Sequence, residues 1–195
     1  MPGLSICVYC GSRSGTRSEF AQATQSVGAE IGRRGWQLVY GGGRAGLMGV
    51  VADAAISAGA RTVGVIPQSL MRRELGHLGL TELHVVQTMH ERKLMMAQRS
   101  DAFLALPGGI GTFEELFEVW SWRQLGYHDK PLALLNVRGY YDAFSNLITQ
   151  AEEFGFVTPA QSQLLNVDSD PIRLLDLLAS LTAQATTAVD DYRQI

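Results

Sequence analysis

The chain reads LPGGIGTFEE from Leu106 to Glu115, and this stretch decides the fold. An apolar run over 101–106 leads into it and an amphipathic run over 113–125 leaves it, which predicts a strand, a glycine turn and a helix. Three glycines in four positions remove the Cβ atoms that would keep an anion from the backbone. The start of the helix adds unpaired N–H groups and the positive end of the helix dipole. The stretch therefore predicts a phosphate-binding turn.

Thr112 and Glu115 within this stretch have two interpretations. Thr-x-x-Glu ahead of an apolar run is the pattern of a capping box, in which both side chains bond only to the helix end. Alternatively, Glu115 is a catalytic carboxylate beside the bound anion. The turn alone does not choose between them.

Composition indicates one domain. The 195 residues are 46% hydrophobic and 18% charged, which is enough for one sizeable core and too little to expect two. A net charge of −3 with scattered arginines offers no basic field, so neither nucleic acid nor a membrane is expected as a partner. Residues 1–12 carry no cationic lead, and no stretch approaches the roughly 20 apolar residues of a membrane span. We therefore expect a cytoplasmic protein.

Cys7 and Cys10 form a C-x-x-C pattern, which raises the question of a redox pair or a zinc site. They fall on a predicted strand, where side chains three residues apart point to opposite faces, whereas a redox pair needs the turn of a helix N-terminus. Two buried thiols are therefore expected. The histidines show no metal-ligand spacing, so no metal is expected. They are His77, His84, His90 and His128.

Strands and helices alternate along the chain. Strands are predicted at 4–10, 36–40, 62–66, 82–86, 101–106, 132–137 and 166–167. Helices are predicted after a capping box of Thr16 and Glu19, after a second one of Thr88 and Glu91, and at 47–58, 113–125, 140–154, 159–165 and 172–181. Residues 67–80 are expected to be mostly loop.

This alternation predicts an α/β fold, a single Rossmann-like doubly wound parallel sheet of about seven strands with helices on both faces. Residues 1–181 would form this domain, and residues 182–195 a loose C-terminal tail. Ligands of such sheets bind beyond the carboxyl ends of the strands, near the switch in strand order. Four turns should share a crevice there. They are Gly11-Ser12, Gly41 to Gly46, Thr88 to Lys93, and Pro107 to Glu115.

Gly41, Gly43 and Gly46 match G-x-G-x-x-G literally, which invites the interpretation of a dinucleotide-dependent oxidoreductase. That fingerprint belongs in the first strand–helix unit and is followed about 20 residues later by an acidic residue for the ribose hydroxyls. Here the turn follows the second predicted strand, and the corresponding position holds Ile66. A turn that packs against the nucleotide or against the sheet is the better interpretation.

Arg92 and Lys93 lie in the first turn of a predicted helix, where cations oppose the helix dipole by roughly 0.3–1 kcal/mol. They are either solvated side chains bridged to Glu74 or Glu91, or contacts of an anionic ligand. Because the turn lies at the predicted crevice, we favour the ligand, for Arg92 more than for Lys93. Glu115 would face the same place. A phosphate cradle, a guanidinium and a carboxylate together suit a phosphorylated sugar whose reacting carbon becomes cationic.

Two motifs carry a resemblance to a known family. Met89-His90-Glu91-Arg92-Lys93 and Pro107 to Glu115 resemble the M-H-x-R-K and P-G-G-x-G-T-x-x-E pair of the LONELY GUY family, the cytokinin riboside 5′-monophosphate phosphoribohydrolases. Tyr40 to Gly46, Gly11-Ser12 and Trp122 to His128 extend the likeness over nearly the whole chain. The resemblance implies hydrolysis of the N-glycosidic bond of an adenosine 5′-monophosphate, plain or N6-modified. The products would be free base and ribose 5-phosphate, and no cofactor is implied.

The resemblance also implies the residues of the site. Arg92 and Glu115 would be catalytic. Glu115 would stabilise the developing oxocarbenium and orient or deprotonate water, whereas Arg92 cannot give up its proton and would act electrostatically. Ser121 stands where a threonine is common in the family. The substrate and its phosphate would be bound by Gly11, Ser12, Gly42, Gly43, Glu74, Met89, Lys93, Gly108, Gly109, Ile110, Gly111, Thr112, Glu114 and Ser121.

Two other activities are weaker interpretations. Members of the family are sometimes labelled lysine decarboxylases, but the only lysines are Lys93 and Lys130, and a pyridoxal Schiff base would need one buried opposite a partner for the ring nitrogen. A non-catalytic nucleotide or molybdenum-cofactor carrier is the main rival, because related carriers share the fold and similar glycine turns. Arg92 together with Glu115 favours the enzyme.

Trp122 needs a separate explanation, because Trp120 already occupies the predicted sheet-facing stripe. Trp122 is either a half-exposed side chain under a loop or part of an interface. The sequence favours a homodimer with Trp122 at an interface beside the active site, which fits the usual homodimer of the family.

Overall fold

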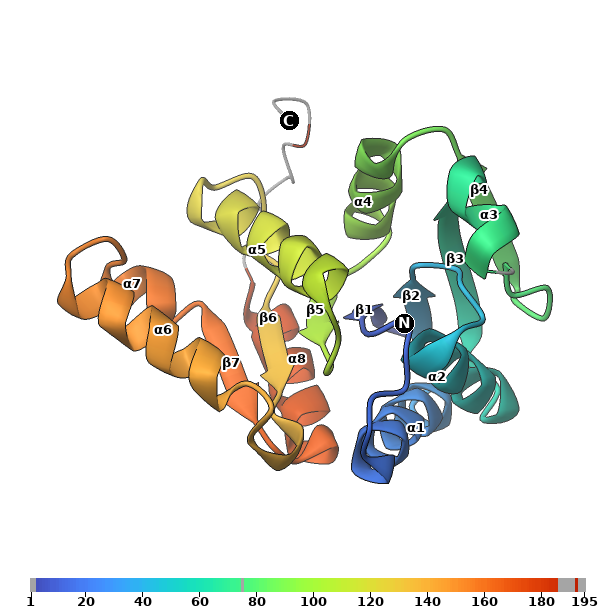
Figure 1. Ribbon diagram of the computed structural model, residues 1–195, viewed down its shortest axis with the longest axis horizontal. Coiled ribbons are helices and arrows are strands. Elements are labelled where there is room, and N and C mark those ends of the chain that lie inside the picture. The colour runs from blue at the N-terminus through green and yellow to red at the C-terminus, as the bar shows by residue number, and fades with distance from the viewer. Residues whose placement is uncertain (1–2, 75, 186–191, 193–195) are drawn as a thin grey trace.

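Seven parallel strands form one sheet in the part of the chain that the structure describes (Figure 1). The structure is a computed structural model that describes residues 3–74, 76–185 and 192, with the backbone alone at 72–74. The strand order is β4-β3-β2-β1-β5-β6-β7, and each neighbouring pair is parallel. The strands are β1 (Ser5–Tyr9), β2 (Gln37–Tyr40), β3 (Arg61–Pro67), β4 (Glu82–Val86), β5 (Ala102–Ala105), β6 (Leu132–Leu135) and β7 (Leu165–Asp168).

Helices connect the strands and cover both faces of the sheet, which confirms the predicted fold. Figure 1 shows α1 and α2 together on one side of the sheet and α4 and α5 on the other. The helices are α1 (Ser18–Arg33), α2 (Gly46–Ser57), α3 (Gln68–Glu74), α4 (Met89–Gln98), α5 (Ile110–Gln124), α6 (Asp142–Glu153), α7 (Pro159–Ser162) and α8 (Pro171–Gln184), with a 3-10 helix η1 (Val137–Gly139) after β6. None of the described helices is both long enough and apolar enough to cross a bilayer.

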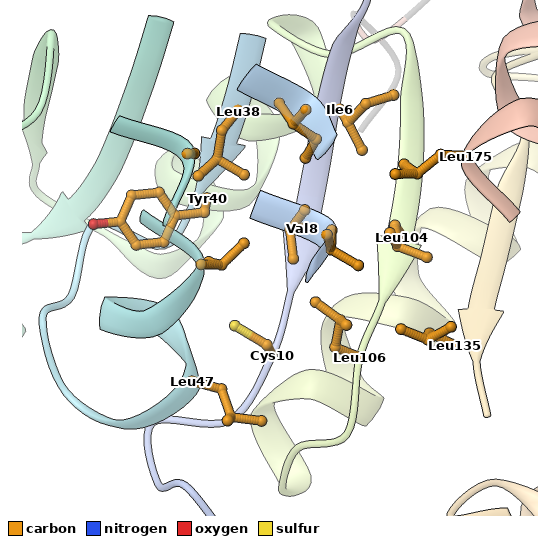
Figure 2. Packing of buried hydrophobic residues seen from close by; sticks show 14 of the residues in the cluster. Ile6, Val8, Cys10, Leu38, Tyr40, Leu47, Leu104, Leu106, Leu135 and Leu175 are labelled. Atoms are coloured by element: carbon orange, nitrogen blue, oxygen red, sulfur yellow. The ribbon is translucent and has the colours of Figure 1, made fainter. Parts of the chain in front are cut away.

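Alternate residues of the central strands enter two separate hydrophobic cores. One core lies between the sheet and α1, α2 and α8, and the other lies under α4 and α5. Figure 2 shows the first core, where side chains of β1, β2, β5 and β6 meet Leu47 of α2 and Leu175 of α8. Because side chains alternate along a strand, Cys7 enters the second core and Cys10 the first. The two cysteines are buried free thiols, as predicted.

The strand order places the switch point between β1 and β5. The chain runs outward from β1 through β2 and β3 to β4, and α4 then returns it to the other side of β1. The turns that follow β1 and β5 therefore diverge to opposite faces of the sheet and leave a crevice between them. These turns contain Gly11-Ser12 and the stretch from Pro107, two of the four that were expected to meet.

Residues 67–80 contain a helix that the sequence reasoning missed. α3 occupies Gln68–Glu74, directly after β3, where mostly loop was expected. A helix of seven residues makes barely two turns, so it shows no helical repeat of apolar residues by which to recognise it.

Of the capping boxes predicted at Thr16 and Thr88, the first is wrong and the second is confirmed. α1 begins at Ser18 after Arg17, without a side-chain cap, so Thr16 and Glu19 form no capping box. Thr88 and Glu91 do form one, and Asp170 caps α8 through the N–H groups of Ile172 and Arg173. α8 continues to Gln184, three residues beyond the predicted end. Of the predicted tail, 186–191 and 193–195 lie outside the described residues.

Candidate functional site

Gly11 joins three turns at the carboxyl edge of the sheet. Its N–H donates to Pro107 O at 3.1 Å, and its carbonyl accepts from Leu47 N at 2.9 Å and Met48 N at 3.3 Å. The approach is close because a Cβ on Gly46, which has φ +59°, would lie 2.3 Å from the backbone of residue 12. The glycines after β2 therefore serve packing against the first turn, which was one of the two interpretations of this segment.

A cavity of about 590 Å³ opens where these turns meet. Its lining includes nine of the sixteen residues that the sequence assigned to the site. Those nine are Gly11, Ser12, Arg92, Gly108, Gly109, Ile110, Gly111, Thr112 and Glu115. The remaining lining residues are Cys10, Arg13, Ser14, Gly15, Phe20, Leu47, Met48, Pro107 and Tyr140.

The N-terminus of α5 is the anion-accepting part of this cavity. α5 begins at Ile110 with Gly109 as its N-cap, and no side chain caps it. The first-turn N–H groups of a helix have no partner within the helix and carry its positive dipole end. By contrast, Gly11 O takes N–H groups of α2, and the Thr88 capping box closes α4. Of these three helix starts, that of α5 is the one whose N–H groups are available to a ligand.

The capping-box interpretation of Thr112 and Glu115 is wrong. α5 starts three residues earlier than predicted, so Thr112 lies inside the first turn and is buried against Gly108. Glu115 lies in the second turn and points to Arg92. The glycine N-cap explains the error, because a glycine provides the extended conformation that a helix start needs without offering a side-chain signal.

Arg92 and Glu115 form a buried ion pair in the cavity wall. The Nη1 atom of Arg92 lies 3.2 Å from Oε1 of Glu115, and the two side chains are 8% and 9% exposed. Two backbone carbonyls orient the guanidinium from behind: Nε donates to Val65 O at 3.1 Å and Nη2 to Gly41 O at 3.4 Å. Ends of α4, α5, β3 and β2 thus meet at one guanidinium.

Lys93 points away from Arg92 and does not line the cavity. Its Nζ donates to Glu114 Oε1 and lies 2.8 Å from Glu118 Oε1. Burial lowers the pKa of Lys93, but the hydrogen bonds to Glu114 and Glu118 outweigh burial, so the pKa is raised overall. Lys93 is therefore a charged link between α4 and α5. Glu91, one of the partners considered from sequence, instead accepts hydrogen bonds from the N–H groups of Gln87 and Thr88.

The other predicted binding residues lie outside this cavity. Gly42 O accepts from His77 N at 3.0 Å, and Gly43 pairs with Gly76, so both hold the segment after α3. Met89 and Ser121 are exposed, Ser121 six residues beyond Glu115 along α5. The side chain of Glu74 lies outside the described residues.

Tyr140 and Phe20 are cavity residues that sequence reasoning missed. Phe20 lies in the first turn of α1, and its ring meets the ring of Tyr140 edge-on at 5.7 Å. Tyr140 follows β6 at the same carboxyl edge of the sheet, so the edge rule that selected the other turns would also have selected it. Arg13 was missed as well, although it follows Gly11-Ser12 directly.

Two further features limit the chemistry of the cavity. Burial raises the pKa of Cys10, which lines it, and raises the pKa of Cys7 to about 12, so both thiols stay protonated at neutral pH and are poor nucleophiles. Among the described residues, no group of three or more His, Cys, Asp and Glu side chains is placed to hold a metal ion.

The fold and the cavity define a Rossmann-like α/β protein with an anion-accepting crevice and an Arg–Glu pair at the switch point of its sheet. A family model described as "Possible lysine decarboxylase" matches residues 48–178. The chain is 49% identical over 82% of its length to cytokinin riboside 5′-monophosphate phosphoribohydrolase LOG3 of Arabidopsis thaliana, covering 74% of that protein. It is 48% identical over 85% of its length to the enzyme of that name from Rhodococcoides fascians, covering 84% of it. The chain belongs to this LONELY GUY family.

Solved structures agree on the fold. The molybdenum cofactor carrier protein of Chlamydomonas reinhardtii matches with a TM-score of 0.72 and 20% identity, over 93% of this chain and 99% of that one. The molybdenum cofactor binding protein of Rippkaea orientalis matches with a TM-score of 0.70 and 22% identity, over 93% and 98%. At these identities the likeness concerns the fold alone.

The two lysines do not fit the decarboxylase label. Lys93 holds its charge between Glu114 and Glu118, and Lys130 donates from Nζ to Ala97 O at 2.9 Å. Neither lines the cavity. A Schiff base with pyridoxal phosphate needs a lysine amine that can lose its proton and reach the cofactor. The cavity therefore does not fit that cofactor.

Proposed function

We propose that the chain hydrolyses the N-glycosidic bond of adenosine 5′-monophosphates, plain or N6-modified, to free base and ribose 5-phosphate. The free base is adenine or a cytokinin. Relatives that are 45–49% identical and are named as cytokinin riboside 5′-monophosphate phosphoribohydrolases support this proposal. The observation that carries it is the buried contact of 3.2 Å between Arg92 and Glu115 in the cavity that the start of α5 also lines.

The start of α5 would bind the 5′-phosphate. Its unpaired N–H groups and dipole favour an anion, and Gly108, Gly109 and Gly111 let a phosphate approach the backbone. A Cβ on Gly109 or Gly111 would meet nothing within 4 Å, so the space above these residues is open. With the phosphate there, the ribose would lie over the second turn of α5, where Glu115 is.

Glu115 would act on the reacting carbon. As the bond from C1′ to the base nitrogen breaks, its electron pair leaves with the base and C1′ becomes an oxocarbenium, which a carboxylate stabilises. Water then attacks C1′ and gives its proton to Glu115 as general base. The base gains a proton from the medium, so the net change is the addition of one water across the bond.

Arg92 would position the Glu115 carboxylate relative to the sugar of the substrate. Its guanidinium keeps its proton and has five N–H donors, of which those on Nε and Nη2 are directed to Val65 O and Gly41 O. The side chain is therefore fixed before substrate binds, and its charge is available to the substrate and to Glu115 without reorganisation.

Replacement of Glu115 by Gln tests the assignment. Glu115→Gln should keep the fold and nucleotide binding, while release of base from AMP or isopentenyl-AMP falls by at least about 100-fold, since a general base is worth roughly 10²–10⁴ in rate. Chromatographic measurement of free base over time gives the rate. Glu118→Gln is the matched control, because Glu118 lies one turn further along α5, pairs with Lys93 and does not line the cavity. Unchanged turnover in Glu115→Gln would remove the assignment.

The carrier reading is the less favoured alternative. Molybdenum cofactor carriers share the fold at 20–22% identity, whereas the relatives named as phosphoribohydrolases reach 45–51%. A carrier would bind a nucleotide without consuming it. Incubation with AMP followed by measurement of adenine separates the two functions, and a panel of monophosphates with and without N6 substituents would identify the preferred base.

A homodimer is part of the proposal. Trp122 is half-buried, with the ring of Tyr192 at 6.0 Å, so its own chain covers it in part. At the C-cap of α5, Leu125 is 62% exposed, which supports an interface at this end of the helix. Light scattering at micromolar concentration should give twice the chain mass, and Leu125→Asp should lower it. A monomeric mass for the unaltered chain would count against the dimer.

We also propose a cytoplasmic location and no nucleic-acid or membrane partner. Cys7 and Cys10 are free and lie in different cores, so they fit a reducing compartment. A net charge of −3 offers no attraction to polyanions. Fractionation of cells that produce the protein would test the location.

A further inference from the structure

Two consecutive tyrosines hold the turn between β5 and α5. The hydroxyl of Tyr140 donates to Gly108 O, and the hydroxyl of Tyr141 donates to Leu106 O at 2.7 Å. The two contacts are alike in chemistry and lie two residues apart on the same turn. They differ in place, because Tyr140 lines the cavity whereas Tyr141 is fully buried beneath it.

The Gly108-Gly109 peptide is the part of this turn that most needs support. No Cβ on either side hinders rotation of the peptide plane, and glycine has the largest backbone freedom of any residue. Because a trans peptide directs its C=O and N–H in opposite directions, rotation of the Gly108 carbonyl would redirect the N–H of Gly109. That N–H is the first donor at the start of α5. A bond to Gly108 O therefore sets the direction of a donor in the proposed phosphate site.

The Tyr140 ring is itself fixed by its surroundings. Phe20 of α1 meets it edge-on at 5.7 Å, and Phe113 of α5 stacks on it at 6.5 Å. The backbone before it makes a tight turn, with φ of +55° at Arg138 and +74° at Gly139. Left-handed backbone at a non-glycine residue is costly and persists where surrounding structure requires it. The ring that carries the hydroxyl is thus held by contacts from α1 and α5, and its backbone by the turn in η1.

We propose that Tyr140 is a positioning residue for the phosphate of the substrate, acting through the Gly108-Gly109 peptide. This inference rests on the proposed function, since it takes the anion at the start of α5 to be a phosphate monoester. Tyr141 supports the same turn structurally and has no part in ligand binding. Tyr140 and Tyr141 therefore offer a matched comparison, in which the same hydroxyl group is removed from one or the other of two adjacent tyrosines.

The test compares Tyr140→Phe with Tyr141→Phe. Loss of one hydrogen bond that orders a donor should weaken binding by about 5- to 10-fold. For Tyr140→Phe we expect the Kd of ribose 5-phosphate and of inorganic phosphate, measured by calorimetry, to rise by this factor. The KM for AMP should rise in parallel, and inhibition by adenine, which lacks a phosphate, should not change. Tyr141→Phe should lower the unfolding temperature and leave all these constants as in the unaltered chain.

The outcomes separate this inference from the proposed function. The positioning role would be overturned if Tyr140→Phe bound ribose 5-phosphate with the Kd of the unaltered chain. It would also be overturned if Tyr140→Phe and Tyr141→Phe raised this Kd equally. Weaker phosphate binding in Tyr140→Phe alone supports the positioning role, whether or not the chain hydrolyses a monophosphate. Absence of hydrolysis in the unaltered chain would overturn only the proposed hydrolase function. If Tyr140→Phe does not fold, Phe20→Leu removes the ring that meets Tyr140 edge-on and keeps the hydroxyl. It should then weaken phosphate binding by a smaller factor, and no change would contradict the proposal.

Discussion

At the scale of single residues, the guanidinium of Arg92 fits its place because Gly41 has no Cβ atom. A Cβ on Gly41 would lie 2.0 Å from Nη2 of Arg92, well inside van der Waals contact, and 3.3 Å from Met48 Sδ. The backbone of Gly41 does not have a positive φ, so alanine suits it conformationally and only the space is missing. Gly41 also accepts the hydrogen bond from Nη2. The residue therefore both admits and orients the guanidinium.

Gly41→Ala should displace the guanidinium from Glu115 and lower kcat by about 100-fold, the cost of misplacing a catalytic group by roughly 1 Å. The KM for AMP should change little, because α5 and its turn are untouched. Steady-state kinetics with thermal unfolding measure both effects. Gly59→Ala is the control: φ is +85° with nothing within 4 Å of an added Cβ, so it costs about 1–2 kcal/mol of stability and leaves kcat alone. A normal kcat in Gly41→Ala would contradict the role.

Site residues that stand in a local sequence motif could be predicted, whereas residues placed by contacts distant in sequence could not. Arg92 and Glu115 stand in motifs that follow strands, so the edge rule brought them together without coordinates. The same edge rule could have placed Tyr140 near the site, but its contact with Gly108, 32 residues earlier in the chain, is visible only in the structure. Lys93 was predicted to contact the ligand, but its side chain is directed to Glu114 and Glu118 on α5. No local sequence pattern reveals these partners.

At the scale of helices and strands, capping patterns were a partial guide. The Thr-x-x-Glu pattern is a true capping box at Thr88 and fails at Thr16 and Thr112. It fails at Thr112 because Gly109 already provides the N-cap and Glu115 has a stronger partner in Arg92. The strands were predicted well, since the central ones are short apolar runs buried on both faces. α3 was not, because seven residues are too few for a periodic signal.

The cap at Thr88 gives a prediction about catalysis as well as stability. Thr88→Ala should cost about 1 kcal/mol of unfolding free energy and, because the first turns of α4 carry Arg92, should also lower kcat several-fold through fraying. Thr158→Ala is the matched control, since Thr158 with Gln161 forms the same capping box on α7, far along the chain from the cavity residues. Urea unfolding and kinetics should show a loss of stability in both variants and a loss of kcat in Thr88→Ala alone. Equal kcat in the two would separate the cap from catalysis.

At the scale of the whole molecule, the sheet explains why distant motifs converge. β1 and β5 are neighbours although α1 to α4 separate them in sequence, so the turns after them meet and form the cavity. The same order leaves β4 and β7 as the edges of the sheet. The β7 edge has its own support, because Asp168 at the end of β7 accepts from Nε and Nη2 of Arg173 at 3.0 and 2.7 Å and so ties the strand to α8.

This ion pair makes the stability of the fold depend on pH in the acid range. Hydrogen bonds from Arg173, aided by the N–H of Asp170, lower the pKa of Asp168 to about 2, from about 3.9 in an unfolded chain. A carboxyl whose pKa is depressed on folding stabilises the fold above its unfolded pKa and loses that effect as pH falls through its folded pKa. Asp168→Asn should therefore be less stable than the unaltered chain at pH 7, by no more than about 1 kcal/mol because the pair is near the surface.

The difference should persist down to about pH 4 and then shrink steadily as pH falls to about 2, as measured by urea unfolding across this range. Arg173→Gln should reproduce the same window, because it removes the cause of the shift rather than the carboxyl. A difference that stays constant to pH 2, or windows that differ between the two variants, would mean that Asp168 acts through its shape or its bond to Asp170 N instead. In that case the β7 edge would be held by the N-cap of α8 and not by the ion pair.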